Sequence, residues 1–237
     1  MKPVVVNKYK EVYDVYIGRG SFWGNPFPIT QEDDRDMVIA KYAKHLQVLY
    51  DQDKITFSKE LLKLTGKRLG CFCKPQACHG DIIVTAWEQM YGVVESFRDE
   101  YSWLSNFQYF DKPLIAGGNT YLTNEHFYQA MKTKDKVIRK AIANHPSKGL
   151  KKFVSSVQLR EDWDDIKLDV MRYGLQYKFS DHNPNLRKKL IETNIMHLQE
   201  GNWWNDKFWG VCLKDGEGEN NLGILIMEVR EEICNAS

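Results

Sequence analysis

The run Asn202-Trp-Trp-Asn-Asp-Lys-Phe-Trp-Gly210 is the most informative stretch of this chain. It places three of the seven tryptophans around one carboxylate, Asp206. Aromatic rings stack on nucleobases, and a carboxylate among them can stabilise a cationic sugar. The alternative interpretation is that the rings are core anchors around a turn that Asp206 caps. The run by itself supports both.

A second segment upstream, Thr123-Asn-Glu-His-Phe-Tyr-Gln-Ala-Met-Lys132, gives the run more weight. Asn124 is expected to be the N-cap of a helix, and His126 is expected to be structural. Successive helical residues advance by about 100°, so a set spaced by three and four lies on one face. That face carries a carboxylate, a phenol, an amide and an amine, from Glu125, Tyr128, Gln129 and Lys132. It indicates either a ligand site or a solvated face with a Glu–Lys pair, and together with the Trp-rich run it suggests a site for a ribosylated base.

Composition indicates an ordinary globular protein. The chain has 237 residues, of which 27% are charged and 43% apolar, enough for one large or two small domains. The net charge of +1 excludes bulk electrostatic attraction to nucleic acid or to a membrane. Any contact with nucleic acid would therefore be local.

The cysteines predict a reducing compartment. There are five, an odd number, and three of them cluster at Cys71, Cys73 and Cys78. Neither a signal peptide nor an apolar run of membrane-spanning length is recognisable. We therefore expect a cytoplasmic protein with free thiols and no membrane partner.

Two units are expected, 1–92 and 93–237, making an α+β protein overall. In the first, strands at 4–6, 12–17 and 68–72 alternate with helices at 36–50, 57–64 and 81–91, which predicts a small α/β domain. The second opens with short strands at 93–97, 107–110 and 114–115 and a turn at 117–119. It continues with helices at 124–144, 147–156, 163–179 and 183–193 and a last apolar element at 222–230. It is therefore expected to be mainly α-helical.

Residues 95–230 resemble the NADAR superfamily, the YbiA-like N-glycosidases. The resemblance rests on pieces in the family's order, chiefly Tyr101-Ser-Trp-Leu-Ser-Asn-Phe107, Tyr121 to Ala130 with Lys132, Asn205-Asp206, Trp209-Gly210 and Asn221-Leu-Gly223. One departure is visible: a Lys-x-x-Gly-Arg-like segment of the family reads Lys151-Lys-Phe-Val-Ser155 here, without the Gly-Arg.

The resemblance implies cleavage of a C1–N bond between a ribose and a base-like amine. The expected substrate is ADP-ribosylated guanine, in nucleic acid or nucleotides. The alternatives are a phosphorylated ribosylamino intermediate of riboflavin biosynthesis, or a sensor that binds ADP-ribose or NAD without turnover. No cofactor or metal is expected for the cleavage, and the oligomeric state is left open.

Site residues follow from this chemistry and from the resemblance. The expected catalytic residues are Glu125 and Asp206, as carboxylates that stabilise the developing cation or move a proton, and Lys132, as an amine able to form a Schiff base. The expected substrate-binding residues are Trp103, Asn106, Phe107, Tyr128, Gln129, Trp204, Trp209, Gly210 and Asn221.

The first unit carries two motifs that resemble a small family of unknown function. One is the loop Gly18-Arg-Gly-Ser-Phe-Trp-Gly-Asn-Pro-Phe27, whose glycines admit a ligand and whose arginine can bind phosphate. The other is Cys71-Phe-Cys-Lys-Pro-Gln-Ala-Cys-His-Gly-Asp81. It is expected to start a helix whose N-terminus faces an anion, with zinc as the alternative. We expect an accessory domain that binds a nucleotide or phosphate through Gly18, Arg19, Trp23, Asn25, His79 and Asp81.

Overall fold

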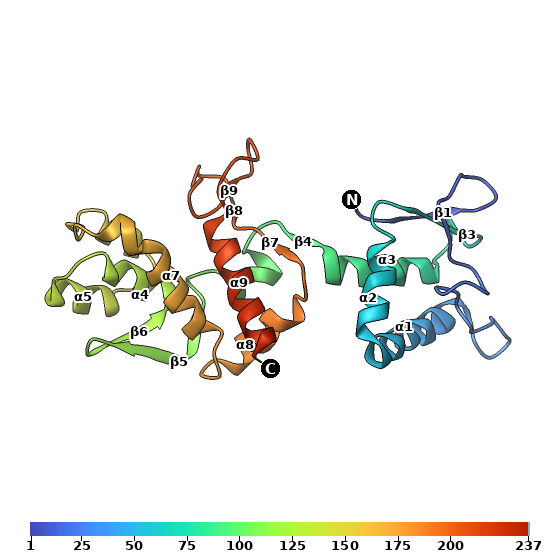
Figure 1. The fold of residues 1–237 in the computed structure, drawn as a ribbon, viewed down its shortest axis with the longest axis horizontal. Coiled ribbons are helices and arrows are strands. Elements are labelled where there is room, and N and C mark those ends of the chain that lie inside the picture. Colours follow the sequence, from blue (N-terminus) through green and yellow to red (C-terminus); the bar gives the residue numbers. More distant parts are fainter. Residues whose placement is uncertain (237) are drawn as a thin grey trace. The chain divides into compact units, whose positions relative to one another are not determined.

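A computed structural model describes residues 1–236 and confirms a mixed α+β architecture. The chain divides into two compact units, with the boundary between Gly92 and Val93 (Figure 1). Among the described residues, no helix is both long enough and apolar enough to cross a bilayer. Each unit is considered by itself.

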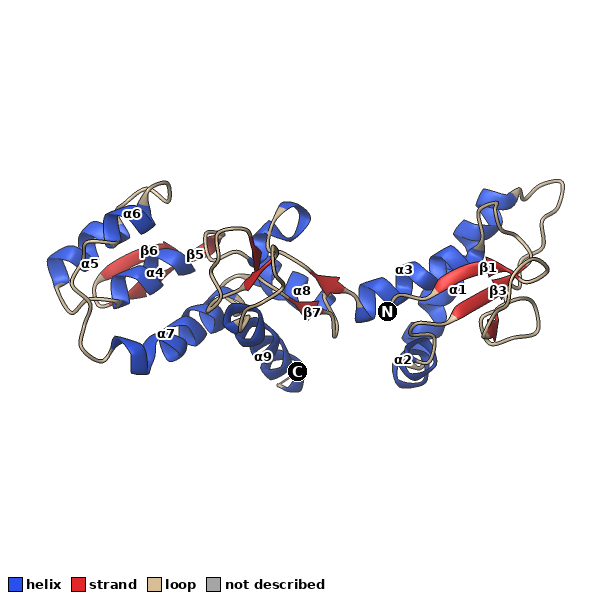
Figure 2. Ribbon diagram, turned by 90° about the horizontal axis from the view of Figure 1, so that it is seen from above, coloured by secondary structure: helices blue, strands red, loops and turns tan. Residues whose placement is uncertain are grey.

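The first unit is built on a three-stranded parallel sheet in the order β1-β3-β2. Its strands are β1 (Val4–Asn7), β2 (Val15–Tyr16) and β3 (Arg68–Cys71), and its helices are α1 (Arg35–Gln52), α2 (Lys54–Leu62) and α3 (His79–Tyr91). The helices pack together and α3 contacts β1, as Figure 2 shows. The glycine-rich loop is anchored in the core, because Trp23 is buried and its carbonyl accepts a 2.7 Å hydrogen bond from the Tyr42 hydroxyl.

Helix α3 begins at His79, two residues before the predicted start at Asp81. The reason is a capping box: the Cys78 sulfur accepts from the Gly80 amide, and the Asp81 carboxylate accepts from the Cys78 amide. One of the two residues of this capping box, Cys78, thus belongs to the cysteine cluster.

The second unit combines helices with very short strands. A hairpin joins β5 (Tyr109–Ala116) to β6 (Asn119–Thr123), and its turn places Gly117 and Gly118 at positive φ. The parallel pairs are β4 (Val93–Val94) with β7 (His197–Leu198), and β8 (Gly201–Asn202) with β9 (Val211–Cys212). The helical elements are η1 (Asp99–Leu104), α4 (Asn124–Met131), α5 (Lys136–Ala143), α6 (Leu150–Val154), α7 (Trp163–Lys178), α8 (Pro184–Glu192) and α9 (Asn221–Asn235).

The single helix predicted over 124–144 is wrong, because the chain breaks it between α4 and α5. Thr133 accepts from the Asp135 amide, and Asp135 in turn caps α5 by accepting from two amides. The N-cap of α4 is Thr123 rather than Asn124, since the Thr123 hydroxyl accepts from the His126 amide. Asn124 instead points into the interior and donates to the Asn106 side chain.

Helix α4 lies between β6, α5 and α7, and Gly174 of α7 permits its close approach (Figures 1 and 2). A Cβ at Gly174 would lie 1.7 Å from the Asn124 side-chain oxygen and 3.2 Å from the Phe127 ring. Both neighbours are buried. The close packing of α4 against α7 therefore requires glycine at position 174.

We predict that Gly174→Ala destabilises the second unit by about 1–3 kcal/mol, because overpacking a buried contact displaces neighbours that have no room to relax. Urea denaturation followed by tryptophan fluorescence measures the change. Asp169→Ala, on an exposed position of α7, is the matched control and should be nearly neutral. Equal stability of Gly174→Ala and the control would contradict the packing of α4 against α7.

Candidate active site

The second unit contains a cavity of about 620 Å³ bordered by α4, α6, α7 and the Trp-rich loop. It combines carboxylates, cations and aromatic rings. Nine predicted residues line it: Asn106, Phe107, Glu125, Tyr128, Gln129, Lys132, Trp204, Asp206 and Trp209. Segments distant in the sequence thus meet at one site.

Glu125 forms the buried acidic wall of this cavity. Its residue is only 4% exposed, and its carboxylate accepts a 2.8 Å hydrogen bond from Gln129 one turn later on α4. The Glu125 amide donates to the Asn106 carbonyl at 2.9 Å, which fixes the start of the helix to the preceding loop. The Lys151 ammonium lies 4.0 Å from the same carboxylate. The carboxylate is thus held in one orientation and retains an oxygen for a ligand.

Lys132 lies at the end of α4, on the same wall as Glu125. Its ammonium lies 5.4 Å from the Tyr128 ring centre and 5.9 Å from that of Trp163. Burial lowers the pKa of Lys132 below its ordinary 10.5, although Glu125 acts in the opposite sense. A lysine in such surroundings provides more neutral amine than an exposed one.

The Trp-rich loop holds Asp206 in a tight turn. Asn202 accepts from the Asp206 amide at 2.9 Å and donates to its carbonyl at 2.8 Å. One Asp206 carboxylate oxygen accepts from the Trp209 amide at 3.0 Å. Asp206 therefore caps the turn, as one interpretation expected, and also borders the cavity.

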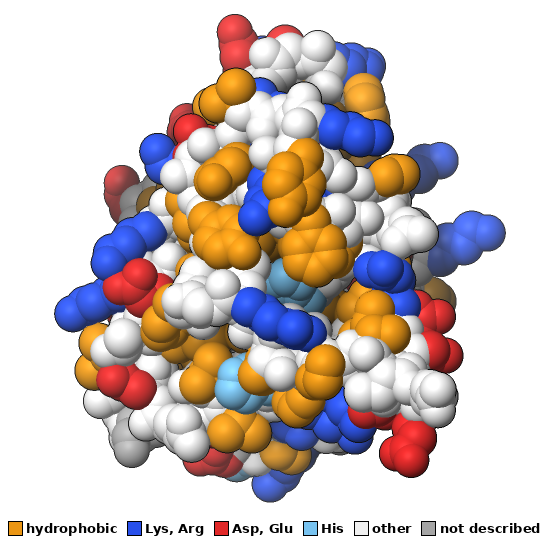
Figure 3. Space-filling model, turned by 90° about the vertical axis from the view of Figure 1, so that its right-hand side faces the viewer, with side chains coloured by type: hydrophobic (Ala, Val, Ile, Leu, Met, Phe, Trp, Pro, Cys, Tyr) orange, Lys and Arg blue, Asp and Glu red, His pale blue; other side chains and the backbone are white. Residues whose placement is uncertain are grey.

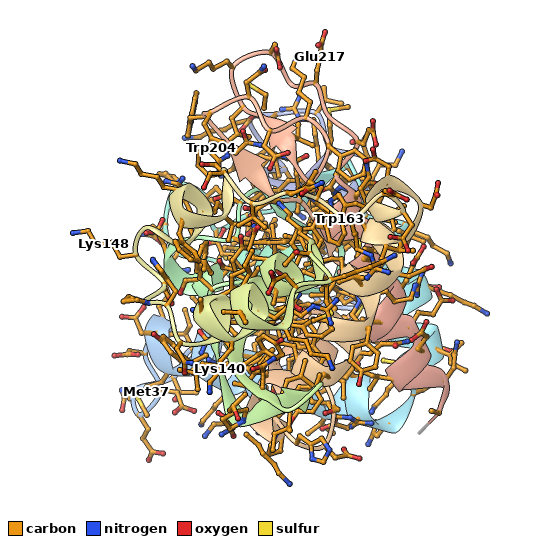
Figure 4. All side chains as sticks on the ribbon, turned by 90° about the vertical axis from the view of Figure 1, so that its left-hand side faces the viewer. Met37, Lys140, Lys148, Trp163, Trp204 and Glu217 are labelled. Atoms are coloured by element: carbon orange, nitrogen blue, oxygen red, sulfur yellow. The ribbon has the colours of Figure 1, made fainter. Side chains whose placement is uncertain are left out.

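Two rings of this loop frame the cavity differently. Trp209 packs edge-on against Tyr128, with ring centres 5.4 Å apart. Trp204 is 54% exposed, and the Arg98 guanidinium lies 5.1 Å from its ring centre. Figure 4 labels Trp204 on this loop and Trp163 at the start of α7, separated across the view. Trp204 is thus a half-exposed ring at the rim of the cavity, with Arg98 over one face.

Three charged lining residues were not predicted from the sequence: Arg98, Lys151 and Glu200. Lys151 belongs to the segment that lacks the family's Gly-Arg, and the missing arginine gave no reason to expect a cation there. Burial raises the pKa of Glu200 to about 7. No pattern around Glu200 distinguishes it from a surface glutamate, so only its burial in the fold reveals it.

Lys178 anchors one loop of the site from a buried position. It is fully buried at the end of α7 and donates to the carbonyls of Leu104 and Ser105 at 2.8 and 2.7 Å. Burial lowers its pKa to about 7, opposed by the charge of Glu200. These bonds hold the loop that carries Asn106 and Phe107 into the cavity.

Three predicted substrate-binding residues lie outside the cavity lining. Trp103 is buried in the core, edge-on to Phe179, and therefore does not offer a stacking face. A side chain at Gly210 would meet the Glu200 carbonyl at 2.1 Å, so this glycine serves a close backbone approach. Asn221 donates to the Phe208 carbonyl at 2.9 Å and ties the Trp-rich loop to α9. All three therefore support the structure around the cavity without lining it.

The first unit has a smaller cavity of about 70 Å³. Gly18, Arg19, Asn25 and His79 line it together with Arg35 and Cys73. Two predicted residues lie elsewhere: Trp23 is in the core, and Asp81 caps α3 and pairs with Lys74 at 2.6 Å. On the face shown in Figure 3, hydrophobic side chains lie around Lys and Arg side chains at the surface.

The second unit is thus an α+β domain whose cavity combines one buried carboxylate, Glu125, with cations and aromatic rings. Residues 93–234 match the NADAR domain family, and the chain belongs to that family. Residues 5–89 match a domain of unknown function, DUF4326.

Several named relatives are similar to the second unit of this chain. N-glycosidase YbiA of Shigella flexneri serotype 5b is 37% identical over 142 residues, which are 59% of this chain and 86% of the relative. Riboflavin biosynthesis protein VVA0006 of Vibrio vulnificus is 33% identical over 140 residues, 57% of this chain and 36% of that protein. The NMR structure of Escherichia coli YbiA matches with a TM-score of 0.54 and 33% identity, covering 62% of this chain and 87% of that one. These relatives support a hydrolase that acts on N-glycosyl bonds.

Proposed function

We propose that the second unit hydrolyses the ribose C1–N bond of an ADP-ribosylated guanine, in nucleic acid or in nucleotides. The observation that carries this proposal is the convergence of Glu125, Asp206 and Lys132 on one cavity with Trp204 exposed at its rim. The carboxylates suit a cationic ribose, and the open ring suits a base that remains attached to a larger molecule.

The proposed reaction requires both stabilisation of positive charge on the ribose and proton transfer. The C1–N bond breaks with its electron pair passing to the base nitrogen, which gains a proton, while a water oxygen bonds to C1 and loses one. Positive charge builds on the ribose in the transition state, and a nearby carboxylate stabilises it. The buried Glu125 carboxylate is assigned that task, and Asp206 is assigned the proton transfer.

Phosphate recognition is assigned to two cations of the cavity. Arg98 and Lys151 both line it, and each can pair with an anionic oxygen of a pyrophosphate. Arg98 immediately precedes η1 and Lys151 lies on α6, so the two cations come from separate segments of the chain. This charge pattern favours a phosphorylated substrate over a neutral nucleoside.

Trp204→Ala is predicted to raise KM by about 5- to 150-fold, since one base–aromatic stacking contact contributes about 1–3 kcal/mol. Steady-state kinetics on the ADP-ribosylated oligonucleotide measures it. Trp203→Ala is the matched control, because Trp203 is equally exposed at 54% but does not line the cavity. An unchanged KM for Trp204→Ala would remove this ring from substrate binding.

A second candidate substrate is a phosphorylated ribosylamino intermediate of riboflavin biosynthesis. The Vibrio vulnificus relative, which is named a riboflavin biosynthesis protein, favours it. Such a molecule needs the same carboxylates and cations but leaves the exposed Trp204 face without a required role. Trp204→Ala should therefore affect this substrate less than the oligonucleotide.

The deciding experiment incubates the full chain with an oligonucleotide that carries ADP-ribose on guanine, in ¹⁸O-labelled water, and follows products by mass spectrometry. Free ADP-ribose carrying ¹⁸O, absent with Glu125→Gln, would establish the proposed hydrolysis. Cleavage of the ribosylamino substrate alone would establish the second candidate. Binding of ADP-ribose without cleavage of either substrate would identify a sensor and overturn both.

A further inference from the structure

We propose that Cys71, Cys73, Cys78 and His79 of the first unit together bind one zinc ion. One potential ligand atom of each residue lies within 4.8 Å of all the others. The proposal concerns the first unit and does not rest on the activity proposed for the second.

The spacing of these atoms fits a tetrahedral site. Zinc–sulfur bonds of about 2.3 Å and zinc–nitrogen bonds of about 2.0–2.1 Å require sulfur–sulfur edges of ~3.8 Å and sulfur–nitrogen edges of ~3.6 Å. The Cys71 and Cys73 sulfurs lie 3.5 Å apart. The His79 Nδ1 lies 4.0 Å from the Cys71 sulfur and 3.8 Å from that of Cys78. Only small shifts separate these distances from a closed shell.

The chain geometry allows the first two cysteines to converge. In a continuous strand the side chains of alternate residues project in parallel from one face and do not converge on one ion, but β3 ends at Cys71. Beyond it the chain turns, and the Gln76 amide donates to the Cys73 carbonyl at 3.0 Å. Cys73 therefore lies in a loop that folds back over Cys71.

The histidine is oriented as a metal ligand is. Its Nε2 lies 2.7 Å from the Ile17 carbonyl, which can only accept, so Nε2 carries the proton. Nδ1 is then left with its lone pair, directed at the sulfurs. A backbone carbonyl on the far nitrogen is the usual partner of a metal-bound imidazole, because it fixes the tautomer and the ring.

Two of the sulfurs are buried beside a helix N-terminus. Cys71 and Cys78 are almost fully buried, and the Gly80 amide donates to the Cys78 sulfur at 3.3 Å at the N-terminus of α3. Arg35 borders the small cavity together with Cys73 and so places positive charge at the edge of the cluster.

Four protein ligands close the coordination shell, so the ion has a structural role. It would join the end of β3, the following loop and the start of α3. Through His79 and the Ile17 carbonyl it would also hold the glycine-rich loop that carries Arg19. The ion would thereby stabilise the small cavity of the first unit, which His79 and Cys73 line.

Metal analysis of the full chain, purified under reducing conditions without chelator, tests the site. We expect about one zinc per chain by mass spectrometry with inductively coupled plasma, and a large loss in Cys71→Ser, Cys78→Ser and His79→Gln. Cys212→Ser is the matched control, because Cys212 is a buried free thiol of the second unit. It should retain the full amount.

A second measurement covers variants that fail to fold. Wild-type protein stripped of metal and titrated with Co²⁺ should develop sulfur-to-cobalt charge-transfer absorption and the strong visible bands of a tetrahedral site. Wild-type protein with no zinc and no such bands would overturn the proposal. So would a disulfide among these cysteines that persists in the reduced preparation, or full zinc content in Cys71→Ser.

Discussion

Glu125→Gln should lower kcat by about 1000-fold or more while leaving the fold intact. The change removes one negative charge from a buried position and keeps the size of the side chain. A preorganised charge in a site that excludes water contributes far more than one in solvent, and a loss of about 4 kcal/mol corresponds to that rate change. Single-turnover release of ADP-ribose measures it, with far-UV circular dichroism to confirm folding.

The control for this prediction is Glu192→Gln, on an exposed carboxylate of α8 that lines no part of the cavity. It should turn over like the wild type. A Glu125→Gln enzyme with wild-type kcat and unchanged dichroism would exclude Glu125 from the reaction. A fall in affinity with unchanged kcat would instead assign it to uniform substrate binding.

Replacing Lys132 should have the next largest effect. Lys132→Met and Lys132→Arg should both reduce kcat by about 100- to 10,000-fold if the neutral amine acts as base or nucleophile. Arginine preserves the charge but cannot be deprotonated, so a fully active Lys132→Arg would assign Lys132 to phosphate binding alone. Reduction with borohydride should trap a covalent adduct only if the amine forms a Schiff base with C1.

The pH dependence of the rate tests whether the neutral form of Lys132 is the active one. Burial lowers the pKa of Lys132, so its neutral form appears at a lower pH than for an exposed lysine. A reaction that uses this form speeds up as pH rises through the lowered pKa and then levels off. Glu200, whose pKa is about 7, adds a separate change near neutrality, and Glu200→Gln should remove that change while keeping the alkaline rise.

Local patterns predicted the elements better than their boundaries. The face of Glu125, Tyr128, Gln129 and Lys132 was predicted from helical spacing, and all four residues line one cavity. The break after this helix was missed, because Thr133 and Asp135 read as ordinary helical residues until their hydrogen bonds to the backbone are seen. The choice of Thr123 as cap was likewise decided by Asn124 turning inward toward Asn106.

Burial was the main source of error within the site. Trp103 and Trp204 look alike in the sequence, yet one packs in the core and the other is half exposed beside the cavity. Glu200 and Lys151 lacked any marker of their own and became site residues because α6 and the segment before β8 approach α4. The convergence of Cys71 and Cys73 could not be expected from a strand predicted over 68–72, because the strand ends at Cys71 and the chain then turns.

The sequence alone determined the α+β class, the membership of a family through ordered motifs, and the acidic and basic residues of one helix face. These depend on short-range spacing, which helical periodicity preserves. Tertiary structure decided which carboxylates are buried, which tryptophan faces solvent, and that three sulfurs and one imidazole nitrogen converge. Burial and convergence depend on chain segments that are distant in sequence but packed together, and such packing also sets the pKa values on which the chemistry depends.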